Sequence, residues 1–430
     1  MMARHVVRVS LLLALSIAML SLAPHGAGMA AARTLVAGSP AGPQQPGLYL
    51  YDLGTGSVRQ ILPLTESDGM PQYAWSPDGS RLAVALNEPD TRSPLQVIDV
   101  ASGSAASVLP SGSGYASQLR WSPGGDRLAF VFASTSDPNV SSALRVWSAA
   151  DGSLQTLVPN LASFPAWTPD GSGITVSLLD PTFDLTSANN RIVTVDATSG
   201  AITQTILSGS GAACQLGLAW SPDGAYLAYG GHGFHEGCLP DTGGVYTWNA
   251  ATGATTQLTA QTAEAPVWSA DGTVLAAVAS GADQSGPSRI AIQKFQPDGS
   301  GTQTLVDGLA NDFPPPRPRF QSANSELIYS TLSCSGADVW ALDPGSTQLR
   351  KLNAGMKYAI GAHLSPDGQT AAWTGAGPDA GTLVLAPVDG GPAMTAFSGA
   401  LSVVPGDFSP DGRWLLFGTI SYPNDPCAGP

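Results

Sequence analysis

Charged side chains are scarce in this chain of 430 residues, since Asp, Glu, Lys and Arg make up only 12% of it. Such a composition, combined with 50 Gly and 35 Pro, excludes a coiled coil, a helical bundle and a charged disordered chain. Basic residues are the scarcer kind: 18 Lys and Arg stand against 32 Asp and Glu, which gives a net charge of −14. An acidic chain repels polyphosphate, so nucleic acid is not expected as a partner.

Long apolar runs are missing after the first thirty residues, so no transmembrane segment is expected in the mature chain. Residues 9–23 (VSLLLALSIAMLSLA) form an apolar run that is short for a bilayer span and follows the basic residues Arg4 and Arg8. This arrangement is typical of a signal peptide. Ala30-Ala31-Ala32 predicts cleavage before Arg33, with cleavage after Ala27 as the alternative. We therefore expect an exported protein, periplasmic or extracellular.

Sequence motifs of common enzymes are also missing. The chain has no G-x-S-x-G pentapeptide, no Walker or dinucleotide glycine fingerprint and no calcium-loop motif. Only three His follow the predicted cleavage point, at positions 232, 235 and 363, so acid–base catalysis has few candidates. No catalytic residue is assigned, and an enzyme is the less favoured class.

One short motif recurs along the whole chain: an aromatic or Leu residue followed by Ser-Pro-Asp-Gly or a close variant. Phe320 (FQSANSELIYS) begins a degenerate eighth copy, and neighbouring copies are 44 to 53 residues apart. That period fits one four-stranded sheet per repeat, as in a β-propeller. The seven clear copies begin at Trp75, Trp121, Trp167, Trp220, Trp268, Leu364 and Phe408.

The motif has the chemistry of a hairpin turn. Pro presets φ, Asp bonds back to the backbone, and Gly takes the positive φ that closes the turn. Strand-like segments such as RLAVAL (81–86) follow it, and each repeat then has a second hairpin with a polar turn that usually ends in Gly. We interpret the motif as structural rather than catalytic.

The two ends of the repeat region predict how the propeller closes. A hairpin of the second kind, Leu48–Leu62, precedes the first motif, and the chain ends just after the hairpin at Phe408. Pairing these two half-blades would complete an eighth blade and remove two open sheet edges. We expect an all-β, closed propeller of eight four-stranded blades, or of seven if the Phe320 repeat is not a full blade. The expected organisation is a signal peptide (1–32), a short linker (33–46), the propeller (47–420) and a C-terminal tail (421–430).

The W-S-P-D-G-x-x-L-A-F pattern with its following D-x-x-x-G hairpin resembles the WD-like repeat of the TolB propeller. Propeller domains of prolyl-oligopeptidase-type peptidases share this pattern. The resemblance covers residues 47 to 420 and implies the fold, whereas propellers host binding modules and enzymes alike. Two differences stand out: only about 15 residues separate the predicted cleavage point from the first strand, where TolB-like proteins carry another domain, and no hydrolase domain follows the last blade.

The segment GGHGFHEGCLPDTGG (230–244) holds the densest chemistry. His232, His235 and Glu236, with Asp241 nearby, could bind a divalent metal such as zinc. The alternative is a Gly-rich exposed loop that tolerates polar residues, and no cofactor is otherwise expected.

Four cysteines suit disulfide bonds in an exported protein. Cys214 and Cys238 flank one hairpin and are expected to pair, which leaves Cys334 and Cys427 as a long-range pair.

Side chains just before the motif aromatics are mostly small, as expected near the axis of a propeller. The exceptions Arg120, Arg319, His363 and Asp407 could bind a small polar or anionic ligand, or could form inter-blade ion pairs. The connections between first and second hairpins are expected on one face and carry acidic residues, among them Asp180 and Asp184. Such a face would suit a basic protein, a cation or a glycan, or it is ordinary solvated loop.

These observations favour an exported, monomeric, non-catalytic TolB-like scaffold that binds a protein or cell-envelope partner through the loop face. The alternative is a metal-dependent enzyme of the polysaccharide lyase or hydrolase type that uses His232 and His235, because some similar propellers resemble oligogalacturonate-type lyases. A small-ligand binder ranks third.

Overall fold

The computed structural model describes most of residues 42–421. The predicted signal peptide and tail lie outside the described residues, as do several internal segments. Those segments are 66–70, 87–94, 111, 113, 134–141, 160–164, 181–186, 210–211, 213–214, 232–243, 262, 264–265, 270, 281–287, 312–326, 334–335, 344–347, 354–355, 358 and 376–378.

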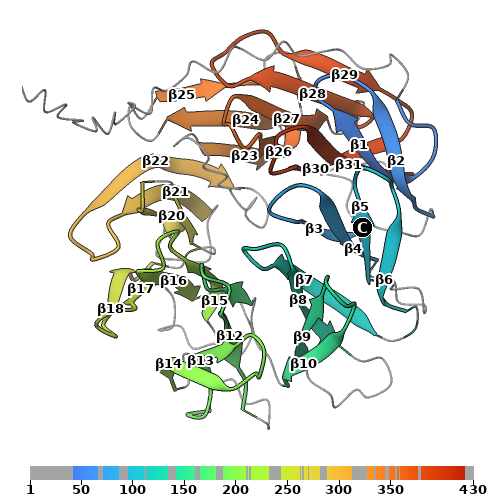
Figure 1. Ribbon diagram of the computed structural model, residues 1–430. Coiled ribbons are helices and arrows are strands. Elements are labelled where there is room, and N and C mark those ends of the chain that lie inside the picture. The colour runs from blue at the N-terminus through green and yellow to red at the C-terminus, as the bar shows by residue number, and fades with distance from the viewer. Residues whose placement is uncertain are drawn as a thin grey trace, which may run out of the picture. The chain divides into compact units, whose positions relative to one another are not determined.

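The described chain forms eight antiparallel sheets arranged as the blades of a propeller (Figure 1). Blade 1 contains β3 (Gln72–Trp75), β4 (Arg81–Ala85), β5 (Leu95–Asp99) and β6 (Ala105–Leu109). Blade 2 contains β7 (Tyr115–Trp121), β8 (Arg127–Ala133), β9 (Ala143–Ser148) and β10 (Leu154–Val158). Blade 3 contains β11 (Ala166–Trp167), β12 (Gly173–Leu178), β13 (Arg191–Asp196) and β14 (Ile202–Ser208). Blade 4 contains β15 (Gln215–Trp220), β16 (Tyr226–Gly231), β17 (Gly244–Asn249) and β18 (Thr255–Thr259).

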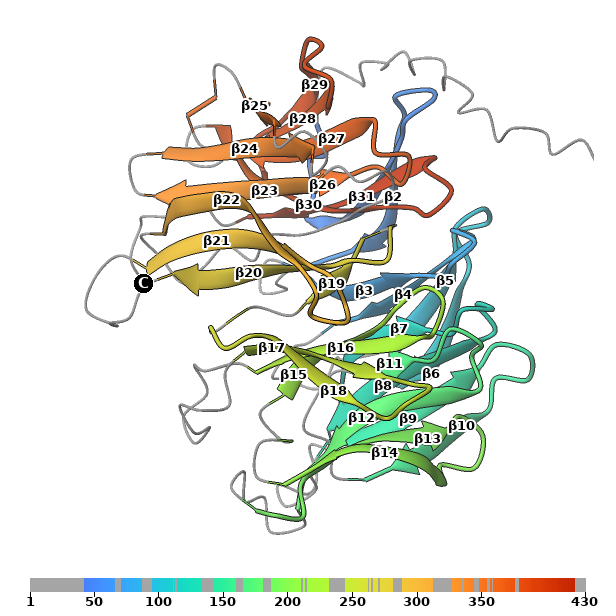
Figure 2. The same ribbon diagram turned by 90° about the vertical axis from the view of Figure 1, so that its left-hand side faces the viewer.

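The second half of the ring repeats this plan, and its strands are drawn in yellow to red in Figure 2. Blade 5 contains β19 (Val267–Trp268), β20 (Val274–Ser280), β21 (Ser288–Phe295) and β22 (Thr302–Asn311). Blade 6 shows three strands, β23 (Leu327–Ser333), β24 (Gly336–Asp343) and β25 (Gln348–Lys351), and the segment with Phe320 that precedes them lies outside the described residues. Blade 7 contains β26 (Ala359–Leu364), β27 (Thr370–Gly375), β28 (Thr382–Pro387) and β29 (Met394–Ser398).

Blade 8 is built from both ends of the repeat region, as the sequence predicts. Its order is β2 (Val58–Pro63), β1 (Gly47–Asp52), β31 (Trp414–Ile420) and β30 (Ser402–Phe408). β1 pairs with β31 from Gly47 opposite Thr419 to Asp52 opposite Trp414. In Figure 1 the blue β1 and β2 accordingly lie beside the red β30 and β31. The eight-bladed, closed propeller is confirmed, and the seven-bladed alternative is not needed.

The motif turns are held by the same bonds in six of the seven clear repeats. In blade 1, Ser76 is buried, its hydroxyl donates to Asp78 (2.6 Å), and it accepts the backbone N–H of Arg81 (2.9 Å). Gly79 has φ of 71°, which closes the turn. In blade 2 the motif reads WSPGG, so Gly124 stands at the position of the Asp. Asp126, two residues after Gly124, accepts the hydrogen bond of the Ser122 hydroxyl instead (2.7 Å). The predicted hairpin turn of the motif is confirmed.

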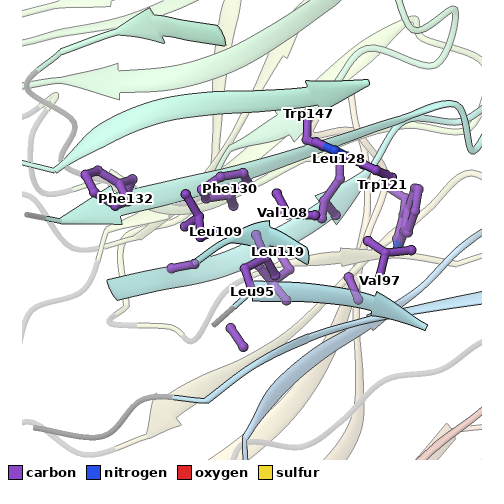
Figure 3. Close-up of a cluster of buried hydrophobic side chains, with 13 residues drawn as sticks. Leu95, Val97, Val108, Leu109, Leu119, Trp121, Leu128, Phe130, Phe132 and Trp147 are labelled. Carbon is purple, nitrogen blue, oxygen red and sulfur yellow. The ribbon is translucent and has the colours of Figure 1, made fainter. Parts of the chain in front are cut away.

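The hydrophobic core lies between neighbouring blades. Leu95 and Val97 of blade 1 pack against Leu119, Trp121 and the other inward side chains of blade 2 (Figure 3). In blades 1 to 5 the motif tryptophan thus packs in the gap between two sheets, and in blades 7 and 8 Leu364 and Phe408 take its place. No helix in the described part of the chain is long and apolar enough to cross a membrane.

Candidate functional site

The first strands of the blades meet at the propeller axis, where successive strands β3, β7, β11, β15 and β19 contact one another. The motif indoles lock these strands together. Trp121 Nε1 donates to the Ala74 carbonyl of the preceding blade (3.0 Å), and Trp167 Nε1 donates to that of Arg120 (3.0 Å). The same bond links Trp268 to Ala219 and Trp75 to Asp407. Four of the residues just before the motif aromatics are therefore fixed through their backbone, whereas Trp220 of blade 4 donates to Thr175 Oγ1 of blade 3 (2.8 Å).

His363 and Asp407, two of the predicted ligand-binding residues, contact each other across blades 7 and 8. His363 Nδ1 lies 2.7 Å from Asp407 Oδ1, and the His363 side chain is buried while that of Asp407 is 32% exposed. The backbone N–H of Asp407 also donates to the Tyr73 hydroxyl of blade 1 (3.0 Å). Asp407 thus contacts residues of blades 7 and 1 from its own place in blade 8. This is the inter-blade pairing that the sequence offered as the alternative to a ligand site.

Arg120 differs from His363 and Asp407. Its Nη1 donates to the Leu119 carbonyl (3.0 Å), and no carboxylate of the described residues forms an ion pair with it. Solvent reaches the side chain, yet enough protein surrounds it that desolvation lowers the pKa of the guanidinium.

Gln118 is a residue of this strand that the sequence analysis missed. Its φ is 56°, and it is the sole non-Gly residue with positive φ within the described chain. It sits where the register of β7 with β8 shifts, between Ser117 and Arg120. Gly217 in blade 4 and Gly361 in blade 7 occupy the equivalent position, three residues before the motif residue, with φ of 67° and 64°. The repeats show no common residue at this position, since blade 1 also holds Gln (Gln72), so the sequence contains no signal for the left-handed backbone of Gln118.

The predicted binding residue Asp180 is held within its own connection. Asp180 is 5% exposed, and its carboxylate accepts hydrogen bonds from Ser187 Oγ (2.8 Å) and Asn189 Nδ2 (2.7 Å). Its backbone N–H donates to the Asn190 side chain (2.8 Å). These bonds order the end of the connection between β12 and β13.

The other predicted site residues lie outside the described residues. They are Asp184, Arg319, the metal candidates His232, His235 and Glu236, and the four cysteines Cys214, Cys238, Cys334 and Cys427. Across the part of the chain that is described, no three His, Cys, Asp or Glu side chains gather as metal ligands would.

The two ends of the strands differ in their connections. At one end, short turns of five residues join β3 to β4 and β5 to β6. At the other end, nine residues separate β4 from β5 and nine separate β8 from β9. We call the first end the turn face and the second the loop face.

Many acidic residues belong to the turn face and are structural. Hydrogen bonds from the motif Ser or Thr are the largest influence that lowers the pKa of Asp78, Asp126, Asp170 and Asp223. For Asp78 the pKa falls to about 2. Part of the net negative charge therefore serves turn formation.

The fold is shared with solved structures of different function. A prolyl endopeptidase matches over 82% of this chain and 54% of its own (TM-score 0.55, 14% identity). Oligogalacturonate lyase from Vibrio parahaemolyticus matches over 78% and 95% (TM-score 0.53, 12% identity). The C-terminal WD40 domain of Sif2 matches over 83% and 96% (TM-score 0.50, 16% identity).

These similarities establish a WD-like propeller fold, as the repeat predicts. The chain spans about half the length of the prolyl endopeptidase. No family model and no curated protein sequence matches the chain.

Proposed function

We propose that this protein is an exported, non-catalytic TolB-like scaffold that binds a protein or cell-envelope partner through its loop face. The observation that carries the proposal is the difference between the two faces. Turn-face polar groups are bonded within their own turns, as Ser76 and Asp78 are, which leaves them little capacity to bind a partner. Most loop-face connections are longer, up to twelve residues between β12 and β13 and between β16 and β17, and they vary from blade to blade, since only two residues join β23 to β24. Recognition residues usually lie on such variable loops of a rigid scaffold.

The charge of the loop-face connections indicates what kind of partner would bind there. The loop-face connections include Asp90, Asp137, Asp184 and Asp283, and few basic residues accompany them. An acidic face favours association with a basic surface and repels an acidic one. A basic protein or a cationic envelope component fits best.

The experiment is cross-linking of the purified protein to envelope extracts, with the bound partner identified by mass spectrometry. In one variant, residues 134–141 are replaced by Gly and Ser at the same length, which removes the charge of Asp137. The matched control is Asp151→Asn, which removes one charge from an exposed turn between β9 and β10 on the turn face. We expect the partner to be retained by the control and lost from the loop variant. Equal recovery by both variants would contradict the loop-face proposal.

The second candidate function is a metal-dependent enzyme acting on a polysaccharide, and it rests on the sequence motif at His232, His235 and Glu236. Elemental analysis of the mature protein beside His232→Ala and His235→Ala tests it. Near-stoichiometric metal that both substitutions remove would favour this candidate over the scaffold.

A further inference from the structure

An Asp followed by Gly is a chemically reactive pair in a polypeptide. The backbone nitrogen of the Gly can attack Cγ of the Asp side chain, because Gly has no Cβ to hinder the approach. The new N–Cγ bond closes a succinimide ring, while the carboxyl hydroxyl and the amide proton leave as water. Hydrolysis returns the water and yields either Asp or isoaspartate, in which the main chain runs through Cβ. Turns of the described chain hold such pairs at Asp78, Asp151, Asp170, Asp223, Asp271, Asp298, Asp367, Asp389 and Asp411.

In the motif turns a hydroxyl group holds the Asp carboxylate in place. Ser76 Oγ donates to Asp78 (2.6 Å), and Ser221 Oγ donates to Asp223 (2.6 Å). This bond opposes the rotation that attack on Cγ requires. It also lowers the pKa of Asp78 to about 2, so the protonated carboxyl group, from which water can leave, is rare at neutral pH. The other four motif Asp residues have the same bond.

The Gly of a motif turn is held as well. The backbone N–H of Gly224 donates to the Ser221 carbonyl (2.9 Å). A Cβ built on Gly224 would lie 3.6 Å from Pro169 Cγ, and one on Gly171 would lie 3.6 Å from Pro123 Cδ. These Pro residues belong to the motif turn of the preceding blade, so neighbouring turns restrict each other. The attacking nitrogen is therefore engaged, and the backbone around it has little room to rearrange.

Asp389, in the turn between β28 and β29, lacks these restraints. Its side chain is exposed, and among the described residues its carboxylate accepts a single hydrogen bond, from the backbone N–H of Gly391 (3.0 Å). The nitrogen of Gly390 lies 3.4 Å from the Pro387 carbonyl oxygen, which is long for a hydrogen bond. A Cβ built on Gly390 would meet no atom within 4 Å. This turn therefore leaves both the carboxyl group and the attacking nitrogen free to move.

Two further pairs lie outside the motif turns, and both are held by hydroxyl groups. Ser153 Oγ donates to Asp151 (2.8 Å). The Ser300 hydroxyl and its backbone N–H both lower the pKa of Asp298. Exposure alone therefore does not distinguish Asp389, whereas the missing hydroxyl does.

We propose that Asp389 is the modification site of the folded protein, where its carboxyl group and the nitrogen of Gly390 form a succinimide that hydrolyses to isoaspartate. The reaction needs no reagent other than water. It is independent of the proposed scaffold function, because the turn between β28 and β29 belongs to the turn face.

The modification has a structural consequence. IsoAsp389 adds one carbon to the main chain of the turn that positions β29. Ala396 and Phe397 of β29 are buried, and the Phe397 ring centroid lies 5.0 Å from that of Phe417 in blade 8. A shift of β29 should therefore loosen the contact between blade 7 and the blade that closes the ring.

The test is incubation of the full mature protein at neutral pH for several weeks, followed by peptide mapping with fragmentation that distinguishes isoaspartate from Asp. We expect isoaspartate to form at Asp389 at least about tenfold faster than at Asp78 or Asp223, because those residues must first break a hydrogen bond to a carboxylate. In urea, where the turns are lost, the three sites should react at similar rates. Equal rates in the folded protein, or no isoaspartate at Asp389, would overturn the proposal.

Two variants test the cause and the consequence. Ser221→Ala removes the hydroxyl from one motif turn and should produce isoaspartate at Asp223 while Asp78 stays unmodified; an unmodified Asp223 would overturn the protective part assigned to the hydroxyl. Asp389→Glu keeps the charge but would have to close a larger ring, so it should resist modification. After incubation the wild type should melt at a lower temperature than Asp389→Glu, although the fresh proteins agree. Equal melting after incubation would overturn the loosening of blade 7.

Discussion

At the scale of single residues, the motif tryptophan does more than fill space. Trp121 is 8% exposed, and its indole N–H satisfies the Ala74 carbonyl of the neighbouring blade. Trp373 of β27 is buried more deeply, at 1% exposed, yet its Nε1 has no partner in the described structure. A comparison of these two residues therefore separates the contribution of the hydrogen bond to stability from the contribution of ring packing.

Trp121→Phe should destabilise the protein more than Trp373→Phe does. Both changes leave a cavity, but only the first also leaves a buried carbonyl without its donor, which adds about 1–2 kcal/mol. Chemical denaturation of the two variants measures the difference in the free energy of unfolding. An equal loss in both variants would mean that the inter-blade hydrogen bond contributes nothing to stability.

At the scale of elements, the sequence predicted the hairpins well because their turns are local. Pro, Asp and Gly specify the motif turn within five residues, and even the WSPGG variant keeps its geometry through Asp126. The candidate site was harder to predict because it depends on contacts between blades. The pairing of His363 with Asp407 joins residues 44 positions apart, and the left-handed backbone of Gln118 has no signal in its own residue type.

The hairpin β1–β2 should be essential for stability. Leu48, Leu50 and Tyr51 are completely buried, so replacement of residues 48–62 by Gly and Ser should cost about 5 kcal/mol or more. Thermal unfolding followed by circular dichroism measures the effect. The control changes the exposed residues Thr203, Gln204 and Thr205 of β14 to Ser and should alter stability by less than about 1 kcal/mol. An unchanged melting temperature in the hairpin variant would contradict closure through blade 8.

At the scale of the whole molecule, the carboxylates of the turn face make the stability of the fold depend on pH. Asp78 has a folded pKa of about 2, below its ordinary value of 3.8, because the Ser76 hydroxyl and the Ser80 groups bond its carboxylate. A lowered pKa means that the ionised carboxylate stabilises the folded state. That contribution is complete above about pH 4 and is lost as the pH falls toward 2.

We therefore expect the stability of the protein to fall steeply between pH 4 and pH 2. Asp78→Asn removes one of the titrating groups, so its stability should depend less on pH in that interval. Urea denaturation of both proteins across the interval makes the comparison. Parallel curves for wild type and variant would show that Asp78 does not contribute to acid sensitivity.

The blade shared by the two ends also has a consequence for biosynthesis. Leu50 pairs with Leu416, so one of the first strands to leave the ribosome must wait for the last one. The intervening blades can form from contiguous segments, whereas the final closure requires a complete chain. A product that stops before β31 keeps an unpaired hairpin and an open sheet edge, where proteases can act. Closure of the propeller therefore requires that synthesis has passed β31.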